Sequence, residues 1–146
     1  MTSEDIMEVA LDLAQLSEIP RDSGVHVRSD NIKTIMATID CDVSDLLLAR
    51  TLKCDAVLTH HPEGVAVLHG WQVMRNQIEQ MVECGVPIAQ AEAALQRRMQ
   101  QVELNSHARN YGRVVQAAQL LKLAFLNIHV PCGQAGMFQS NHQVSE

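Results

Sequence analysis

The chain of 146 residues is poor in aromatic side chains, with one Trp, one Tyr and two Phe. Its core must therefore come from aliphatic residues and from the seven methionines, which fill irregular space. No apolar run is long enough to cross a bilayer, which excludes a membrane span as the basis of function. The first residues, Met1 to Asp5, are polar and acidic, unlike a secretory signal. We therefore expect a cytoplasmic protein with no membrane partner.

Basic residues and paired cysteines are also scarce. The formal net charge is -6, which argues against nucleic acid as a main partner because phosphate binding needs a basic surface. No Cys-x-x-Cys pair is present, which excludes a zinc ribbon and a thioredoxin motif. We expect small, reduced thiols at the four cysteines, which are Cys41, Cys54, Cys84 and Cys132. Neither a Gly-x-Ser-x-Gly elbow nor a phosphate-binding glycine loop occurs.

A strand, a helix and a second strand are predicted between Thr34 and Pro62. The strands are expected at 34–39 and 54–59, and the helix between them at 43–53, capped by Asp42 or Ser44. A crossover of this length joins parallel strands through a right-handed connection. Parallel pairing would place Asp40 and His60 at the same edge of the sheet.

The rest of the chain is predicted as one α/β domain over residues 1–132. Further helices are expected at 3–16, 71–84, from Pro87 to about 102, and at 107–121, with extended segments at 25–27 and 124–129 and a loop at 63–70. The polar tail at 133–146 lacks periodicity and is expected to be disordered.

Two adjacent histidines follow the apolar strand in Val57-Leu58-Thr59-His60-His61-Pro62. Ligands gather outside the carboxyl ends of strands in open α/β sheets. Successive side chains alternate between faces, so the two rings are expected to diverge and to serve two ions if Pro62 bends the chain away. The alternative is that one ring is a hydrogen-bonded turn residue and the other is simply exposed.

Another apolar strand ends in Ile128-His129-Val130-Pro131, and the strand at 34–39 ends at Asp40. If the three strands are parallel neighbours, His60, His61, His129 and Asp40 meet at one rim. Imidazole and carboxylate suit zinc, iron, manganese or nickel, and such a metal lowers the pKa of bound water. Alternatively, Asp40 is a helix N-cap and His129 a hydrogen-bonded core residue. The other histidines carry no pattern and are predicted to be surface or capping residues; they are His26, His69, His107 and His142.

These residues resemble the dinuclear-metal family often called type 2 GTP cyclohydrolase I, which is also named after a yeast co-activator interacting factor. The resemblance runs from the first helix to about Pro131, and its most specific part is Asp55-Ala56-Val57-Leu58-Thr59-His60-His61-Pro62. The supporting motifs are Ile19-Pro20-x-Asp22-Ser23-Gly24, the Ile39-Asp40 strand end with its following Ala49, His107-Ala108-Arg109-Asn110-Tyr111, and Asn127-Ile128-His129-x-Pro131.

The resemblance implies an α/β fold with a mixed, largely parallel sheet flanked by helices, equivalent to the amino-terminal half of that family's fold. It also implies a toroidal homo-oligomer and two divalent ions held by paired histidines, a bridging Asp and a His-x-x-x-Glu. His60 and His61 match the paired ligands, and His129 matches a third. Gly133 stands where the bridging Asp is expected, and the second half is absent from this chain.

Two functions follow from these departures. The first is a metal-dependent hydrolase of a small molecule with an incomplete dinuclear site, in which a divalent transition metal is bound at full or lower occupancy. The second is a non-catalytic, truncated relict that acts as an oligomerising scaffold. A third interpretation, a redox or regulatory protein that uses Cys41 or Cys132 as a low-pKa thiol, has less support. The sequence therefore leaves open whether the chain is an enzyme.

Overall fold

We describe the protein from a computed structural model, which covers residues 1–108 and 110–131, apart from the side chains of residues 72 and 73. The helices are α1 (Ser3–Leu13), α2 (Val43–Thr51), the 3-10 helix η1 (Gly64–His69), α3 (Gly70–Glu83), α4 (Ile88–Ala108) and α5 (Arg113–Leu121). The strands are β1 (Gly24–Val27), β2 (Ile35–Thr38), β3 (Ala56–Thr59) and β4 (Ala124–Asn127). The predicted tail at 133–146, with Gly133 and the neighbouring Cys132, lies outside the described residues.

The four strands form one sheet in the order β1-β4-β3-β2. Strands β2, β3 and β4 are parallel, whereas β1 pairs antiparallel with β4. The predicted mixed, largely parallel sheet is therefore confirmed, as is the strand-helix-strand unit. In register, Thr38 lies opposite Thr59 and Thr59 opposite Asn127, so three strands end side by side at one rim.

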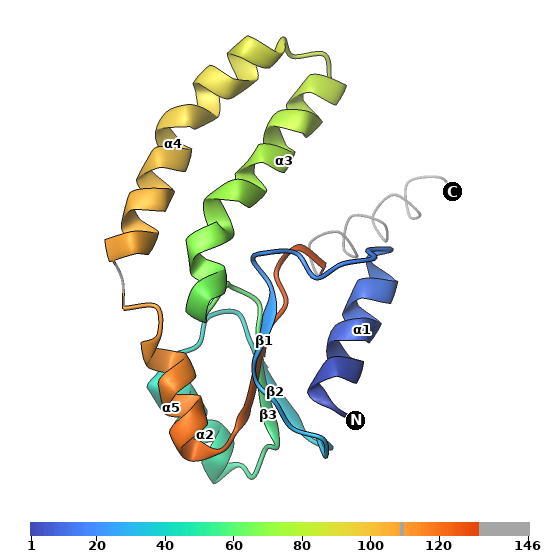
Figure 1. Ribbon diagram of the computed structural model, residues 1–146, viewed down its shortest axis with the longest axis vertical. Coiled ribbons are helices and arrows are strands. Elements are labelled where there is room, and N and C mark those ends of the chain that lie inside the picture. The colour runs from blue at the N-terminus through green and yellow to red at the C-terminus, as the bar shows by residue number, and fades with distance from the viewer. Residues whose placement is uncertain (109, 132–146) are drawn as a thin grey trace.

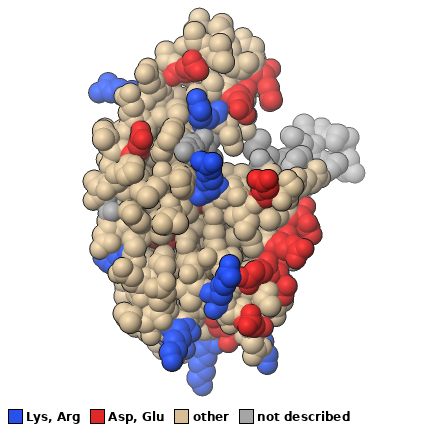
Figure 2. Space-filling model, viewed as in Figure 1, with Lys and Arg blue, Asp and Glu red and all other residues tan. Residues whose placement is uncertain are grey.

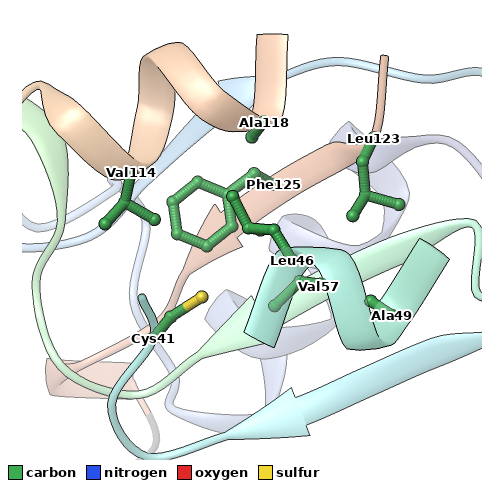
Figure 3. Close-up of a cluster of buried hydrophobic side chains, with 8 residues drawn as sticks. All are labelled: Cys41, Leu46, Ala49, Val57, Val114, Ala118, Leu123 and Phe125. Carbon is green, nitrogen blue, oxygen red and sulfur yellow. The ribbon is translucent and has the colours of Figure 1, made fainter. Parts of the chain in front are cut away.

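Helices cover both faces of the sheet (Figure 1). On one face, α2 and α5 pack against Val57 and Phe125, and Figure 3 shows the Phe125 ring between the side chains of these two helices. On the other face, α1 contributes Ile6 and Met7, which pack on Ala56, Ala124 and Leu126. Because successive strand residues face opposite sides, β3 and β4 each supply both cores, whereas the edge strand β2 contributes Met36 to the first core alone.

Local hydrogen bonds explain where several elements begin. Thr2 and Asp5 form a capping box at α1, and Asp42 with Asp45 forms another at α2, so Asp42 is the predicted cap. The Asp55 carboxylate accepts bonds from the backbone of residues 33 and 34, which fixes β2 beside β3 and lowers the pKa of that carboxyl.

Helices α3 and α4 pack against each other as a long hairpin beyond the sheet (Figure 1). Gly85 has φ +89° after the last residues of α3, as expected of the residue that ends a helix. Pro87 accepts the first amide bonds of α4, in agreement with its predicted place at the helix start.

Three boundaries differ from the sequence prediction. Helix α1 ends at Leu13 because Gln15 adopts a left-handed conformation, with φ +56°. The expected loop at 63–70 contains η1. His107 lies in the last turn of α4, which continues to Ala108, instead of beginning the next helix.

Four of the 17 acidic side chains lie on α1, and Figure 2 shows acidic side chains at the lower right, where this helix lies. They are Glu4, Asp5, Glu8 and Asp12. Among the described residues, no helix is long and apolar enough to cross a membrane.

Replacement of a buried leucine should test this packing. Leu46 on α2 is fully buried against the α5 side of the sheet, so Leu46→Ala should lower the free energy of unfolding by about 2–5 kcal/mol. Leu120→Ala is the matched control, since Leu120 is 86% exposed and its replacement should change stability by less than about 0.5 kcal/mol. Urea unfolding measures both, and equal losses would contradict the packing described here.

Candidate functional site

Three histidine rings gather at the rim where the parallel strands end. The ring centroids of His60 and His129 are 4.8 Å apart, those of His60 and His61 5.3 Å, and those of His61 and His129 6.1 Å. The backbone amides of His60 and His61 bond to Thr38 and Ile39, which holds both residues beyond the end of β3. The predicted divergence of the two neighbouring rings is wrong, because both lie past the strand, where pleated alternation no longer applies.

In each of the three rings, Nδ1 is bonded to a carboxylate oxygen or a backbone carbonyl oxygen. Such an oxygen can only accept a hydrogen bond, so Nδ1 must be the donor. The Nδ1–H of His61 donates to Asp40 at 2.6 Å, and that of His129 donates to Asp22 at 2.6 Å. The Nδ1–H of His60 donates to the carbonyl of Ile128 at 3.2 Å. A proton on Nδ1 leaves the lone pair of each neutral ring on Nε2.

Asp22 is the functional residue to which sequence reasoning assigned no role. Its carboxylate is fully buried, accepts the His129 Nδ1–H, and lies 3.4 Å from the Ser23 hydroxyl. That hydroxyl in turn accepts the backbone amide of His129 at 3.0 Å. The Asp22-Ser23-Gly24 motif contained this signal, but nothing in the sequence linked it to a histidine more than 100 residues away.

Asp40 reaches the predicted rim but engages His61 rather than capping a helix. Its side chain is 84% exposed, and that of His61 is 49% exposed. The His129 ring is hydrogen-bonded, as the alternative interpretation expects, but its side chain is 31% exposed and therefore only partly buried. All four predicted site residues thus lie at one rim.

The donor chemistry of this cluster fits a divalent transition metal, because imidazole ligands usually donate their second nitrogen to a carboxylate or a carbonyl. The positions of these side chains, however, do not provide a complete set of metal ligands. Within residues 1–108 and 110–131, no group of three or more His, Cys, Asp or Glu side chains is arranged to hold one metal ion. The structure therefore brings together imidazoles with suitable tautomers without forming a closed ligand set.

Burial lowers the pKa of His60, and the neighbouring His129 and His61 rings lower it further, against the opposing effect of the Ile128 carbonyl. The neutral form of His60 is thereby favoured near pH 7, and only that form has a lone pair for a ligand. The same shift also makes His60 a poor source of positive charge.

A second histidine site lies on the α5 side of the sheet. The pairing of β1 with β4 shifts register between Val25 and Val27, so His26 sits in a bulge and packs against Phe125, with ring centroids 5.5 Å apart. Its Nε2 is 2.8 Å from the Asn127 side-chain oxygen, and the Asn127 amide donates to the backbone carbonyl of Asp22 at 2.7 Å. The prediction that His26 is a surface or capping residue is wrong.

The cysteine interpretation loses support at Cys41. Burial, together with the nearby carboxylates of Asp45, Glu63 and Asp42, raises the pKa of the Cys41 thiol to about 12. A reactive thiolate needs a lowered pKa, so Cys41 is an inert core thiol. Cys132 lies outside the described residues.

Comparison with solved structures identifies a NIF3 superfamily protein from Sphaerobacter thermophilus as similar to this chain. The similarity has a TM-score of 0.89 and 37% sequence identity, and covers 93% of this chain. It covers 50% of the other protein, so the present chain spans about half the length of that relative. No family model and no curated protein matches the chain.

The environment of His26 predicts a pH-dependent stability. Burial lowers its pKa below the ordinary value of 6.5, against the raising effect of the Asn127 bond. The unfolded chain therefore takes up a proton before the folded chain does, and stability should fall as the pH drops through about 6.5. We expect His26→Gln to reduce the slope of unfolding free energy between about pH 7.5 and 5.5, measured in urea.

His107→Gln serves as the control for this measurement, because His107 is exposed at the end of α4. It should keep the wild-type pH slope. A slope that His26→Gln leaves unchanged would show that this ring does not carry the effect.

Proposed function

We propose that the chain is a metal-binding domain of the NIF3 superfamily and that His60, His61 and His129 bind a divalent transition metal through Nε2. The observation that carries this proposal is the common tautomer of the three rings, each with Nδ1–H bonded to a carboxylate or carbonyl. This arrangement of outer partners is typical of imidazole ligands. The similarity to a NIF3 superfamily protein at 37% identity supports the family assignment.

Within this proposal, Asp40 and Asp22 have the same role at two different rings. Each carboxylate orients an imidazole and increases its basicity, and each adds negative charge next to the expected cation. We therefore replace the earlier assignment of Asp40 as a direct ligand with that of a positioning residue for His61. Among the candidate metals we propose zinc, because it accepts imidazole ligands at low coordination numbers.

The activity that we propose is hydrolysis of a small molecule. A bound metal would supply a hydroxide near neutral pH by lowering the pKa of its water. The chain itself contributes the three imidazoles, the two carboxylates that hold them in place, and an open rim at the carboxyl ends of the strands. Three imidazoles leave coordination positions for water and substrate, or for a ligand from a partner chain.

Zinc titration tests the metal proposal. We expect isothermal titration calorimetry of the wild-type chain to show saturable Zn²⁺ binding, and the His60→Ala/His61→Ala double variant to lose it, because two of the three proposed ligands are gone. His107→Ala removes an exposed histidine outside the cluster and should bind zinc as the wild type does. Absence of wild-type binding, or equal binding by the double variant, would refute the proposal.

A further variant separates outer-partner support from direct ligation. Asp22→Asn keeps the size of the buried side chain but removes the carboxylate that accepts the His129 Nδ1–H. Zinc affinity should fall by about 10–100-fold, as is usual for the loss of an outer partner. The control is Asp30→Asn, which removes an exposed carboxylate elsewhere.

The edge of the sheet favours a second candidate function, that of an oligomerising scaffold. Strand β2 is an edge strand that carries no charge and no proline, the usual features that block pairing. Ile35 and Ala37 are exposed because α1 packs over β1, β4 and β3 and leaves the same face of β2 uncovered, and Ile39 beyond the strand is 65% exposed. We propose that a second copy of this chain pairs along β2.

Light scattering after size exclusion tests this pairing. We expect the wild-type chain to have a mass above that of one chain, and Ala37→Lys to shift it toward the monomer, because a lysine at the centre of an edge strand opposes pairing. Ala93→Lys adds the same charge on the exposed side of α4 and should leave the mass unchanged. A monomeric wild type would remove the scaffold proposal without affecting the metal proposal.

A further inference from the structure

His129 lies beyond the end of the sheet, and a side chain takes over the positioning of its backbone. Strand β4 ends at Asn127, and the amide of Ile128 still donates to the Thr59 carbonyl of β3 at 3.0 Å. The next amide, that of His129, donates instead to the Ser23 hydroxyl at 3.0 Å. The main chain that carries this proposed metal ligand is therefore attached to the segment before β1, and Ser23 provides the attachment.

Two further hydrogen bonds fix the segment to which Ser23 belongs. The Ser23 amide donates to the Pro20 carbonyl at 2.9 Å, which closes a turn before β1. The side-chain amide of Asn127 donates to the Asp22 carbonyl at 2.7 Å, and the antiparallel register places Gly24 opposite Asn127. Ser23 is only 7% exposed. Its hydroxyl therefore extends from a buried backbone that is itself held against β4.

The Ser23 hydroxyl also closes a ring of hydrogen bonds around His129. Its oxygen accepts the His129 amide, while its hydrogen donates to Oδ1 of Asp22 at 3.4 Å. Oδ2 of the same carboxylate accepts the imidazole Nδ1–H at 2.6 Å. A hydroxyl can donate and accept at the same time, which an alanine side chain at this position could not do. The backbone and the ring of one histidine are thus held by two neighbouring residues.

We propose that Ser23 is a positioning residue for His129, which keeps the neutral imidazole in the Nδ1–H tautomer and so leaves Nε2 for a metal ion. The importance of Ser23 for metal binding rests on the proposed function, whereas its effect on the ring requires no metal. Alanine at this position would remove the acceptor of the His129 amide and one donor to the Asp22 carboxylate. The ring would then be free to turn away from that carboxylate and to exchange its tautomer.

Nitrogen NMR of the imidazole rings in the metal-free chain tests this role, because the two ring nitrogens differ in chemical shift when only one carries a proton. In mildly alkaline buffer, where a free imidazole is neutral, we expect a single Nδ1–H tautomer at His129 of the wild type. Ser23→Ala should give a mixture of tautomers there, while His61, which bonds to a different carboxylate, keeps its own. Ser106→Ala is the matched control, since Ser106 is also 7% exposed and its hydroxyl bonds to the Val102 carbonyl within α4.

Zinc titration gives the second measurement. Ser23→Ala should bind zinc about 10–100-fold more weakly than the wild type, the loss that is usual for an outer partner, and Ser106→Ala should bind as the wild type does. The proposal is overturned by mixed tautomers at His129 of the wild type, by a single Nδ1–H tautomer in Ser23→Ala, or by unchanged zinc affinity in that variant. If the wild type itself binds no zinc, the metal proposal fails and the tautomers alone decide the role of Ser23.

Hydrogen exchange of the wild-type chain decides the question if Ser23→Ala does not fold. Because the His129 amide is bonded to the Ser23 hydroxyl, it should exchange at least about tenfold more slowly than the same amide in an unstructured peptide. Exchange at the rate of the peptide would show that this bond is absent in solution, and the role of Ser23 would then be refuted.

Discussion

The parallel register of β2, β3 and β4 is the constraint on which the candidate site depends. Because Thr38, Thr59 and Asn127 lie in one row, the segments that leave the three strands begin at the same height. The peptide bonds beyond the strands extend this alignment, since the amide of Ile128 bonds to Thr59 and that of His60 bonds to Thr38. A shift of one residue in any strand would exchange the two faces and separate the rings.

Hydrogen bonds from the same rim then fix the chemistry of the rings. The strand ends bring each histidine close to an acceptor on another segment: the Ile128 carbonyl for His60, Asp40 for His61 and Asp22 for His129. The geometry of the sheet therefore also determines the tautomer of each imidazole. The His26 ring, held in the opposite tautomer by Asn127, shows that the neighbouring acceptor decides which nitrogen stays free.

The parts of this architecture that depend on local sequence could be predicted, and those that depend on distant contacts could not. Apolar runs and a crossover of suitable length identified the parallel strands, and the polar residues after them identified the rim. The roles of Asp22 and His26 were missed because each depends on β4, about 100 residues further along the chain. The bulge at His26 also follows from the pairing of β1 with β4, which local sequence does not reveal.

The buried Asp22 carboxylate also affects the electrostatics of the site. An ionised carboxylate without a nearby cation costs several kcal/mol when it is taken out of water. Asp22 is fully buried, and among the described residues no Lys or Arg forms an ion pair with it. Its closest hydrogen-bond partner is the His129 ring, whose Nδ1–H donates to it at 2.6 Å. A metal ion on Nε2 of the same ring would place positive charge close to this carboxylate. Because a proton and a metal ion compete for one nitrogen, the affinity of the site for metal should increase as the proton concentration falls.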